Sequence, residues 1–184
     1  MACNVVRGVL SSSQLQELWD AYAELRESVP LVPIFNPGGR RRQMEVPQHH
    51  VAAQLAQSIL SISRHGRHRH VAQCSFLHSE AGCKAQQLHT DWDPKKVSFG
   101  RHIRVPMSML VAMQDNTLLI TLHHGTVTLN TGDACFFDAT CVHGGAAYID
   151  NCNTRFFAYI ASDMWRTPPQ DETYIFQARR RRTK

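Results

Sequence analysis

The sequence predicts a mainly β protein with helices at its N-terminal end and a core of jelly-roll type. From residue 71 to residue 162, short runs of β-branched, aromatic and sulfur-containing residues are separated by turn residues, with no helical pattern between them. Two amphipathic helical patterns precede this region. A chain of 184 residues, 43% of them hydrophobic, can bury one sizeable core. We therefore expect one domain over residues 1–177, with a helical front at 1–65, the β core at 71–162 and a basic tail at 178–184.

The helical front contains two expected helices. The first lies within residues 10–30, where serines can cap the N-terminal end, apolar residues recur at three- and four-residue spacing, and Pro30 closes the pattern. The second begins near Pro47, since proline is well accommodated in a first helical turn. Its apolar stripe is formed by Val51, Leu55, Ile59 and Ile62.

Eight strands are expected in the β core. The turn signal Asn-Thr-Gly-Asp within LNTGDA, residues 129–134, predicts a tight hairpin between two of them. The expected strands lie in VAQCSFL, AQQLHTDW, IRVPMSMLVAM, TLLITL, GTVTL, ACFFDA, CVHGGAAYI and TRFFAYIA.

The basic residues are unevenly distributed along the chain. Five of them, at 179–182 and 184, equal the whole net charge of +5, so the remainder is formally neutral. The basic stretches at 38–43 and 63–70 are polar or turn-rich, and we expect both to be solvated loops. The tail has two open interpretations, a solubilising end and a segment that binds a partner such as nucleic acid.

The cysteines and the hydropathy indicate the compartment. The six cysteines form no CxxC pair, which favours reduced thiols over disulfides or a zinc site. The N-terminal residues lack the pattern of a signal peptide, and no apolar stretch approaches the length of a membrane span. We expect a soluble, intracellular protein, cytoplasmic or nuclear, without membrane partners.

Three residues form a candidate metal site. Side chains two apart on a strand point to the same side, so His89 and Asp91 can present a nitrogen and an oxygen to one point. Asp93 has the same parity, but Pro94 follows it and the strand should end near Trp92. His143 supplies a third ligand from an apolar run. Two imidazoles and one carboxylate with open positions on one face suit non-heme Fe(II).

A basic residue follows the candidate ligands. Arg155 opens the strand pattern TRFFAYIA, twelve positions after His143. A guanidinium inside a barrel is costly unless it is paired, and its planar fork can grip a carboxylate through two hydrogen bonds. Arg155 therefore indicates an acidic cosubstrate.

The segments HTD at 89–91 and GDACFFDATCVHGG at 132–145, together with Arg155, resemble the Fe(II)- and 2-oxoglutarate-dependent dioxygenases with a double-stranded β-helix core. Within that superfamily they look most like the phytanoyl-CoA and prolyl hydroxylase-like branches. The resemblance implies His89, Asp91 and His143 as iron ligands and Arg155 as the partner of the distal carboxylate of 2-oxoglutarate.

The implied reaction uses O2 and 2-oxoglutarate to hydroxylate, or oxidatively demethylate, a C–H substrate while 2-oxoglutarate is decarboxylated to succinate. Because Asp91 is present, the resemblance disfavours halogenation. Such enzymes usually place a hydroxyl beside the arginine, but the residue two after Arg155 is Phe157. Thr121, Ser108 and Tyr159 remain open as its source.

Further assignments concern the surroundings of the metal. Inward amides of Gln73 or Gln87 could orient 2-oxoglutarate, and Trp92 with Asp93 could form a substrate rim. Four phenylalanines are candidates for the shielding apolar walls, with ordinary core packing as the alternative: Phe136, Phe137, Phe156 and Phe157.

Two other function classes stay open. A cupin-like metalloprotein without 2-oxoglutarate would leave Arg155 without a role, and a non-catalytic nucleic-acid or protein-binding module would leave the three metal candidates unexplained. For the enzyme, basic residues in the loops favour an anionic substrate. They are Arg40, Arg41, Arg42, Lys95, Lys96 and Arg101.

Overall fold

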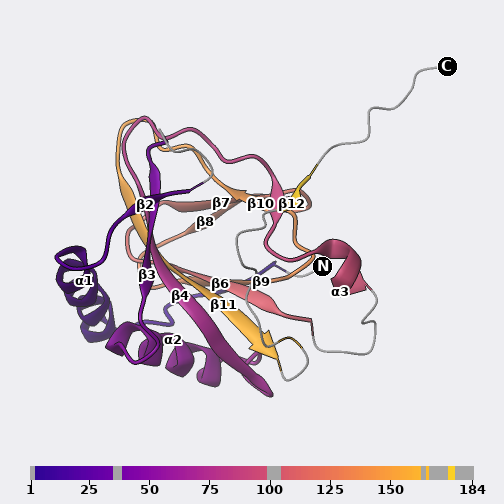
Figure 1. The fold of residues 1–184 in the computed structure, drawn as a ribbon, viewed down its shortest axis with the longest axis horizontal. Helices are drawn as coiled ribbons and strands as arrows, with labels where there is room; N and C mark the ends of the chain where they lie inside the picture. Colours follow the sequence, from indigo (N-terminus) through magenta and orange to yellow (C-terminus); the bar gives the residue numbers. More distant parts are fainter. Residues whose placement is uncertain (1–2, 35–38, 99–104, 163–164, 166–173, 177–184) are drawn as a thin grey trace.

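Two antiparallel sheets face each other in the protein, and two helices lie outside the larger one (Figure 1). This computed structural model describes residues 3–34, 39–98, 105–162, 165 and 174–176. The larger sheet has the strand order β1-β9-β6-β11-β4-β3-β2, and the smaller has the order β12-β5-β10-β7-β8. The prediction of a mainly β protein with helices near its N-terminal end is therefore confirmed.

The elements run in the following order. They are β1 (Cys3–Val6), α1 (Ser12–Arg26), β2 (Val32–Pro33), β3 (Arg41–Val46), α2 (Val51–Ile62), β4 (Arg69–Ser79), β5 (His89–Thr90), α3 (Pro94–Ser98), β6 (Met107–Ala112), β7 (Thr117–Thr121), β8 (Gly125–Leu129), β9 (Ala134–Asp138), β10 (His143–Gly145), β11 (Asn153–Ser162) and β12 (Tyr174–Ile175).

Helix α1 forms as the sequence predicts. Ser11 caps it, accepting a hydrogen bond from the Gln14 backbone N–H, while the Gln14 side chain accepts one from the Ser11 backbone N–H. This reciprocal pair satisfies two backbone donors that a helix start otherwise leaves free. Leu18, Ala21, Tyr22 and Leu25 are buried on the face toward the large sheet.

Helix α2 begins later than predicted. His50 caps it, since its Nδ1 accepts from the Ala52 backbone N–H, and Pro47 precedes the helix instead of lying in its first turn. The expected apolar stripe is only half right, because Leu55 and Ile59 are buried while Val51 and Ile62 are exposed. Alanines and Leu60 complete the buried face.

The stretch at 38–43 was expected to be a loop, but Arg41–Val46 form strand β3. Met44 and Val46 are buried in the core under the helices, and the strand pairs in antiparallel register with β4. The run of arginines conceals this strand because Arg41 is itself buried, at 4% exposure. At 63–70 the expected loop is shorter, since β4 already begins at Arg69.

Each of the eight predicted runs contains a strand, but the predicted hairpin at 129–134 is wrong. β8 belongs to the small sheet and β9 to the large one, so the turn carries the chain between sheets. Gly132 has a φ of +84°, which favours glycine, and Asp133 accepts the Asn130 backbone N–H at 2.9 Å. The real hairpin joins β7 to β8.

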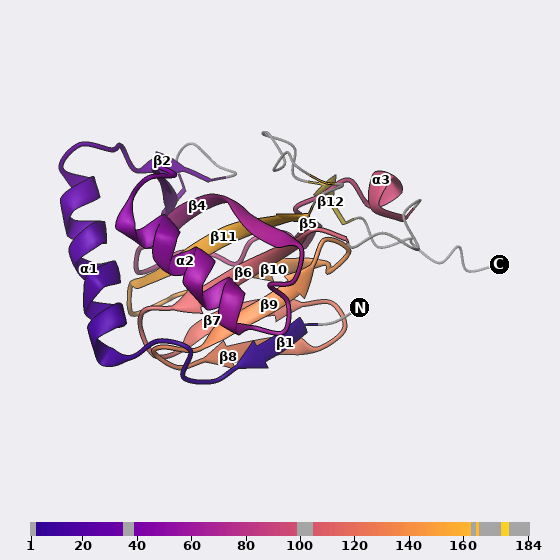
Figure 2. The same ribbon diagram turned by 90° about the horizontal axis from the view of Figure 1, so that it is seen from below.

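The large sheet has two different faces. Its outer face packs on α1 and α2 (Figure 2) through an apolar cluster that includes Met44, Phe76, Phe136 and Phe156. Its inner face looks toward the small sheet and carries Leu110, Phe137 and Phe157 beside polar side chains. Strand alternation thus separates the apolar core under the helices from the layer of side chains between the two sheets, which we call the chamber.

Two further predictions concern the whole chain. The six cysteines are free thiols, as expected, although the sulfur atoms of Cys3 and Cys135 lie 2.8 Å apart. Within the described residues, no helix is long and apolar enough to cross a membrane. The basic tail at 178–184 lies outside the described residues.

Candidate metal and cosubstrate site

The three predicted metal ligands meet between the sheets. His89 on β5 lies directly opposite His143 on β10 in the antiparallel register, and Asp91 follows β5. The Asp91 Oδ1 atom lies 3.7 Å from His89 Nε2 and 3.6 Å from His143 Nε2. One ligand atom from each residue falls within 4.8 Å of the others, and all three residues are buried. The set has the composition of a facial site, with two nitrogens and one oxygen.

Neighbouring groups orient each ligand. The Nδ1 atoms of His89 and His143 lie 2.8 and 3.0 Å from the carbonyl oxygens of Gln87 and Cys141. A carbonyl only accepts, so each Nδ1 carries the proton and each Nε2 keeps its lone pair for a metal. Ser108 donates to Asp91 Oδ2 at 2.7 Å, which leaves Oδ1 turned toward the imidazoles.

The electrostatics favour metal-competent protonation states. Burial, and then the neighbouring His143, lower the pKa of His89, against a smaller opposing effect of Asp91. A neutral imidazole is the form that binds a metal, so burial assists ligation near neutral pH. Tyr159 lies on the inner face beside Ser108 in the register; burial and the charge of Asp91 raise its pKa well above the ordinary value.

Arg155 lies deep between the sheets, at 2% exposure. Its Nη1 donates to Ser79 Oγ at 3.0 Å, and its guanidinium carbon lies 5.8 Å from the centre of the Tyr148 ring. Burial lowers its pKa to about 10, which still leaves the group charged at neutral pH. No acidic side chain in the described part of the chain pairs with Arg155, so an acidic ligand would supply the missing countercharge.

A second buried arginine lies near Arg155. The Nη2 of Arg41 donates to the Ala146 carbonyl oxygen at 2.7 Å, whereas its buried Nη1 has no hydrogen-bond partner. The positive charge of Arg41 helps to lower the pKa of Arg155, so the two guanidinium groups lie close enough to repel each other. A Cβ on Gly145 would clash with the Arg41 guanidinium and the Gln86 side chain, whereas a Cβ on Gly144 would lie 3.1 Å from the Gln86 carbonyl oxygen. Gly145 therefore leaves room for the Arg41 guanidinium.

Sequence reasoning missed Ser79 and Gln86, and it assigned Arg41 to a basic loop that favours an anionic substrate, not to a position near Arg155. Ser79 Oγ is the hydroxyl that contacts Arg155, and the Gln86 side chain accepts from the Gly145 backbone N–H at 2.8 Å. Ser79 lies 76 positions before Arg155, and only the β4–β11 register brings them together. An inward polar residue on a neighbouring strand was the available signal, but the register cannot be read from sequence.

The predicted cosubstrate residues other than Arg155 are placed differently. Gln73 pairs with Tyr159, not with the Arg155 end of the strand, and its amide donates to Glu45 at 2.7 Å. Gln87 contributes its carbonyl oxygen to His89. Thr121 Oγ1 donates to the Gly125 carbonyl oxygen and accepts from the His124 N–H. The Thr121 hydroxyl therefore stabilises the β7–β8 turn.

Aromatic residues form only part of the expected walls and rim. Phe137 lies 4.5 Å from the His143 ring centre and packs in the inner cluster with Phe157. Phe136 and Phe156 face the helices instead, because they have the opposite parity. Trp92 is buried against Tyr159 and Trp165. Asp93 accepts the Lys95 backbone N–H at 2.8 Å and so supports the start of α3.

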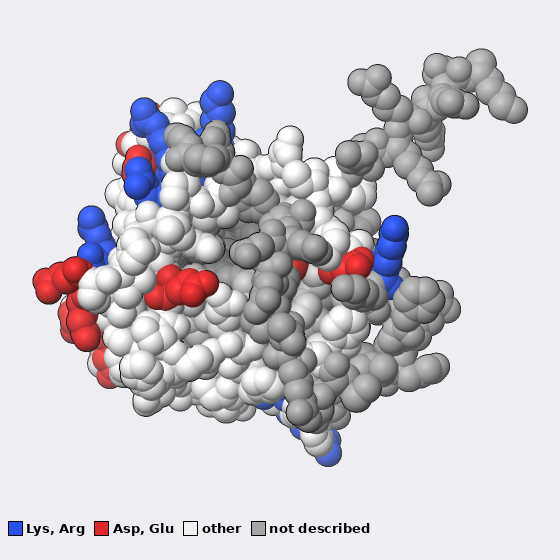
Figure 3. Space-filling view, viewed as in Figure 1, with Lys and Arg blue, Asp and Glu red and all other residues white. Residues whose placement is uncertain are grey.

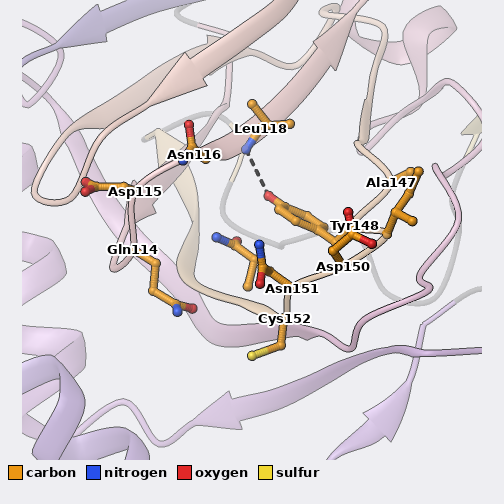
Figure 4. Close-up of a pocket in the computed structure, with 11 residues that line it drawn as sticks. Gln114, Asp115, Asn116, Leu118, Ala147, Tyr148, Asp150, Asn151 and Cys152 are labelled. Carbon is orange, nitrogen blue, oxygen red and sulfur yellow. Dashed lines mark hydrogen bonds between the residues drawn. The ribbon is translucent and has the colours of Figure 1, made fainter.

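A separate cavity of about 530 Å³ opens near the ends of β6 and β11 (Figure 4). Residues 114–116, 118 and 147–153 provide its lining, and no metal candidate contributes to it. Tyr148 lines this cavity, donates to no described acceptor there, and accepts from the Leu118 backbone N–H at 2.9 Å. The same ring lies against Arg155, so Tyr148 is the part of the wall between this cavity and the guanidinium.

The comparisons with known proteins concern the fold. No family model and no curated protein sequence matches the chain. Among solved structures, the epimerase SnoN in complex with Fe3+, alpha-ketoglutarate and nogalamycin RO is 15% identical, with a TM-score of 0.63 over 96% of this chain and 91% of its own. HygX from Streptomyces hygroscopicus, with nickel, 2-oxoglutarate and hygromycin B bound, is 11% identical, with a TM-score of 0.61 over 88% and 83%.

A third similar structure is EctD from S. alaskensis with 2-oxoglutarate and 5-hydroxyectoine, at 14% identity and a TM-score of 0.62 over 87% of this chain and 72% of its own. The chain thus has the fold of the iron- and 2-oxoglutarate-dependent enzymes. The particular branch predicted from the sequence, phytanoyl-CoA or prolyl hydroxylase-like, is not tested by these similarities and stays a prediction.

Proposed function

We propose that the protein is a non-heme Fe(II)- and 2-oxoglutarate-dependent oxygenase that oxidises a C–H bond of a small molecule. The observation that carries this proposal is the buried set of His89, Asp91 and His143, with ligand atoms within 4.8 Å of one another. The shared fold supports it, since SnoN, HygX and EctD were each obtained with 2-oxoglutarate or its synonym alpha-ketoglutarate. We also infer that the two sheets constitute a double-stranded β-helix.

Each residue has a defined task in this proposal. The two imidazoles and Asp91 would hold Fe(II), which with O2 and 2-oxoglutarate supplies the oxidising chemistry. Arg155 would bind the distal carboxylate of 2-oxoglutarate, with Ser79 Oγ beside it as the hydroxyl that the sequence left unassigned. Arg41, with its unpartnered Nη1, adds positive charge to the same chamber. Phe137 and Phe157 exclude water from its apolar wall.

The outcome at the substrate is a narrower proposal. Hydroxylation or oxidative demethylation follows from the resemblance of the motifs. The structural neighbours include an epimerase, SnoN, and a carbocyclase, SnoK, so related folds support other outcomes at a C–H bond. A small-molecule substrate is favoured, because nogalamycin RO, hygromycin B and 5-hydroxyectoine occupy the neighbours. An intracellular location stays a prediction.

The test needs no substrate. Fe(II) and then 2-oxoglutarate are added to the protein without oxygen, and a weak visible charge-transfer band of the chelated keto acid is expected. His89→Ala should abolish the band, and Arg155→Ala should require much higher 2-oxoglutarate concentrations to produce it. Glu24→Gln, a change on the exposed outer surface of α1, is the control and should leave the band unchanged.

Two results would contradict the proposal. Iron binding without a band would favour the cupin-like metalloprotein. Failure to bind iron would show that His89, Asp91 and His143 are not a metal site. It would favour the alternative of a non-catalytic binding module that uses the basic residues. Binding of a polyanion at several salt concentrations, with and without residues 178–184, measures that alternative directly.

A further inference from the structure

The inner face of the large sheet continues from β6 through β11 and β4 to β3, next to the edge strand β2. Ser108 on β6 pairs with Tyr159 on β11, and Tyr159 pairs with Gln73 on β4. On the next strand, Glu45 of β3 pairs with Ser75, which is opposite the inward-facing Phe157. Directly paired residues point to the same face of a sheet, so Glu45 and Gln73 lie on the face that carries Ser108 and Phe157, where Glu45 is exposed and Gln73 is half-buried.

Their hydrogen bond leaves two acceptor oxygens available to a ligand. Gln73 Nε2 donates one of its two N–H groups to Glu45 Oε1 at 2.7 Å. Within the described residues neither side chain has another hydrogen bond or ion pair. The carbonyl oxygen of Gln73 and the second oxygen of Glu45 therefore remain available to a ligand that donates hydrogen bonds.

The nearby arginines make contacts within the fold. Arg40 donates to the Ala81 carbonyl oxygen at 2.6 Å and Arg42 pairs with Glu80 at 3.1 Å, whereas Arg41 donates to Ala146 through Nη2 and keeps its Nη1 without a partner. These are three of the six basic residues that favoured an anionic substrate. In the described part of the face in Figure 3, Lys and Arg lie toward the outline of the molecule, whereas acidic side chains also occur nearer its middle.

One exposed apolar side chain lies on the small sheet beside the metal ligands. Ile175 on β12 pairs with His89 and therefore points to the same side of the small sheet as that metal ligand. Its side chain is 50% exposed and therefore accessible to the apolar part of a ligand. Neighbouring strands lie ~4.8 Å apart, so Gln73 and Glu45 lie roughly 10 to 15 Å from the strand whose Ser108 supports Asp91.

We propose that Glu45 and Gln73, three and two strands from Ser108 respectively, select the substrate by binding a protonated amine, while Ile175 contacts its apolar part. This deepens the proposed function and rests on it. A carboxylate and an amide carbonyl that face one ammonium group accept its hydrogen bonds and balance its charge. An anionic group at the same place would meet the like charge of Glu45, with only the second N–H of Gln73 to donate to it.

The experiment compares three probes that share one apolar chain. Hexylamine, hexanol and hexanoate are titrated by ligand-observed NMR into the anaerobic protein saturated with Fe(II) and 2-oxoglutarate. We expect hexylamine to bind about fivefold more tightly than the other two, as for a partly exposed charged hydrogen bond. In Glu45→Gln this preference should fall to within twofold, while the 2-oxoglutarate charge-transfer band stays unchanged. Glu24→Gln, the charge-matched control, should keep the preference.

The proposal is overturned if hexanoate or hexanol binds as tightly as hexylamine, if none of the three binds at 10-fold molar excess over a millimolar protein sample, or if the preference survives in Glu45→Gln. The charge-transfer band separates this failure from failure of the proposed function. A band without amine preference rejects only the amine site, and amine preference without a band rejects only the 2-oxoglutarate chemistry.

Discussion

The two faces of the seven-stranded sheet are built from the same strands but have different roles. On β11, Phe156 points outward and is fully buried among α1, α2 and β4, while Arg155 and Phe157 point inward to the metal chamber. On β9, Phe136 and Phe137 divide in the same way. The outer face is a continuous apolar cluster, whereas the inner face keeps buried charges without acidic partners among the described residues.

This difference indicates how stability and function are distributed. Apolar burial on the outer face stabilises the fold in proportion to the area removed from water. The inner face instead holds Arg155 and Arg41 at a cost in desolvation that no acidic side chain among the described residues offsets and that an acidic ligand would offset. Substitutions on the outer face should therefore change stability, and those on the inner face should change ligand affinity.

The largest effect is expected for Phe156→Ala. Its ring lies 5.1 Å from that of Phe76 and is completely buried, so its removal leaves a cavity under the helices. We expect a loss of ~3–5 kcal/mol in the free energy of unfolding, measured by urea denaturation. At a temperature where the variant is folded, 2-oxoglutarate affinity should stay within twofold. A tenfold loss of 2-oxoglutarate affinity with little loss of stability would contradict the assignment of stability to the outer face and ligand binding to the inner face.

Arg155→Met tests the inner face, where we expect a loss of ligand affinity without a loss of stability. Methionine fills much of the volume without the charge, so 2-oxoglutarate affinity should fall ~100-fold, or about 2.7 kcal/mol, because a charged two-point contact is lost. The ligand-free protein should be as stable as the wild type or more so, since a buried charge without an acidic partner is removed. Titration of the charge-transfer band and urea denaturation measure the two quantities.

Arg155→Lys is the matched variant, because it keeps the charge and loses the planar fork. It should bind 2-oxoglutarate more tightly than Arg155→Met and more weakly than the wild type. A marked loss of ligand-free stability in Arg155→Met would show that the guanidinium supports the fold itself.

Ser108→Ala should have a smaller effect that is confined to the metal. Its hydroxyl holds Asp91 Oδ2 at 2.7 Å, and loss of such a supporting hydrogen bond lowers metal affinity by about tenfold. Competition with a chromophoric chelator measures this affinity. Ser75→Ala, on the same face two strands away, is the control and should bind metal normally. Equal losses in both variants would mean that the face responds as a whole.

The sequence could predict the metal ligands because a two-residue spacing on a strand needs no knowledge of the fold. His89 and Asp91 share a face whatever their neighbours are, and His143 with Arg155 completes a recognisable motif. Strand register decided what the sequence could not predict. Ser79 reaches Arg155 only through the β4–β11 pairing, and a strand was hidden in the arginine run because Arg41 is buried.

The same limit explains the errors about turns and polar residues. Asn-Thr-Gly-Asp at 130–133 predicts a tight turn correctly, but a turn does not specify whether its strands pair or enter different sheets. Gln73 was correctly expected on a strand of the core. Its bond to Glu45 depends on β3, which the sequence did not predict, so its relation to the cosubstrate residues could not be foreseen.

The smallest expected effect concerns His65, a residue expected in a solvated loop. Its ring stacks on Phe136 at 5.0 Å on the outer face, and Arg64 Nε donates to its Nε2 at 3.4 Å. Burial, then the charges of Arg64 and Arg69, lower its pKa below the ordinary value of 6.5. An unfolded chain therefore binds the proton more readily than the folded protein does.

The contribution of His65 to stability should be complete above pH 6.5 and lost as the pH falls through its lower folded-state pKa. Because the ring is partly exposed, solvent screening should keep the effect below ~1 kcal/mol. His78 and His89 titrate with the same sign, so only the difference between variants isolates this residue. Urea midpoints from pH 7.5 to 5.0 should fall less steeply in His65→Gln than in the wild type. If the urea midpoint changed equally steeply with pH in both proteins, His65 would be exposed to solvent and would not pack on the outer face.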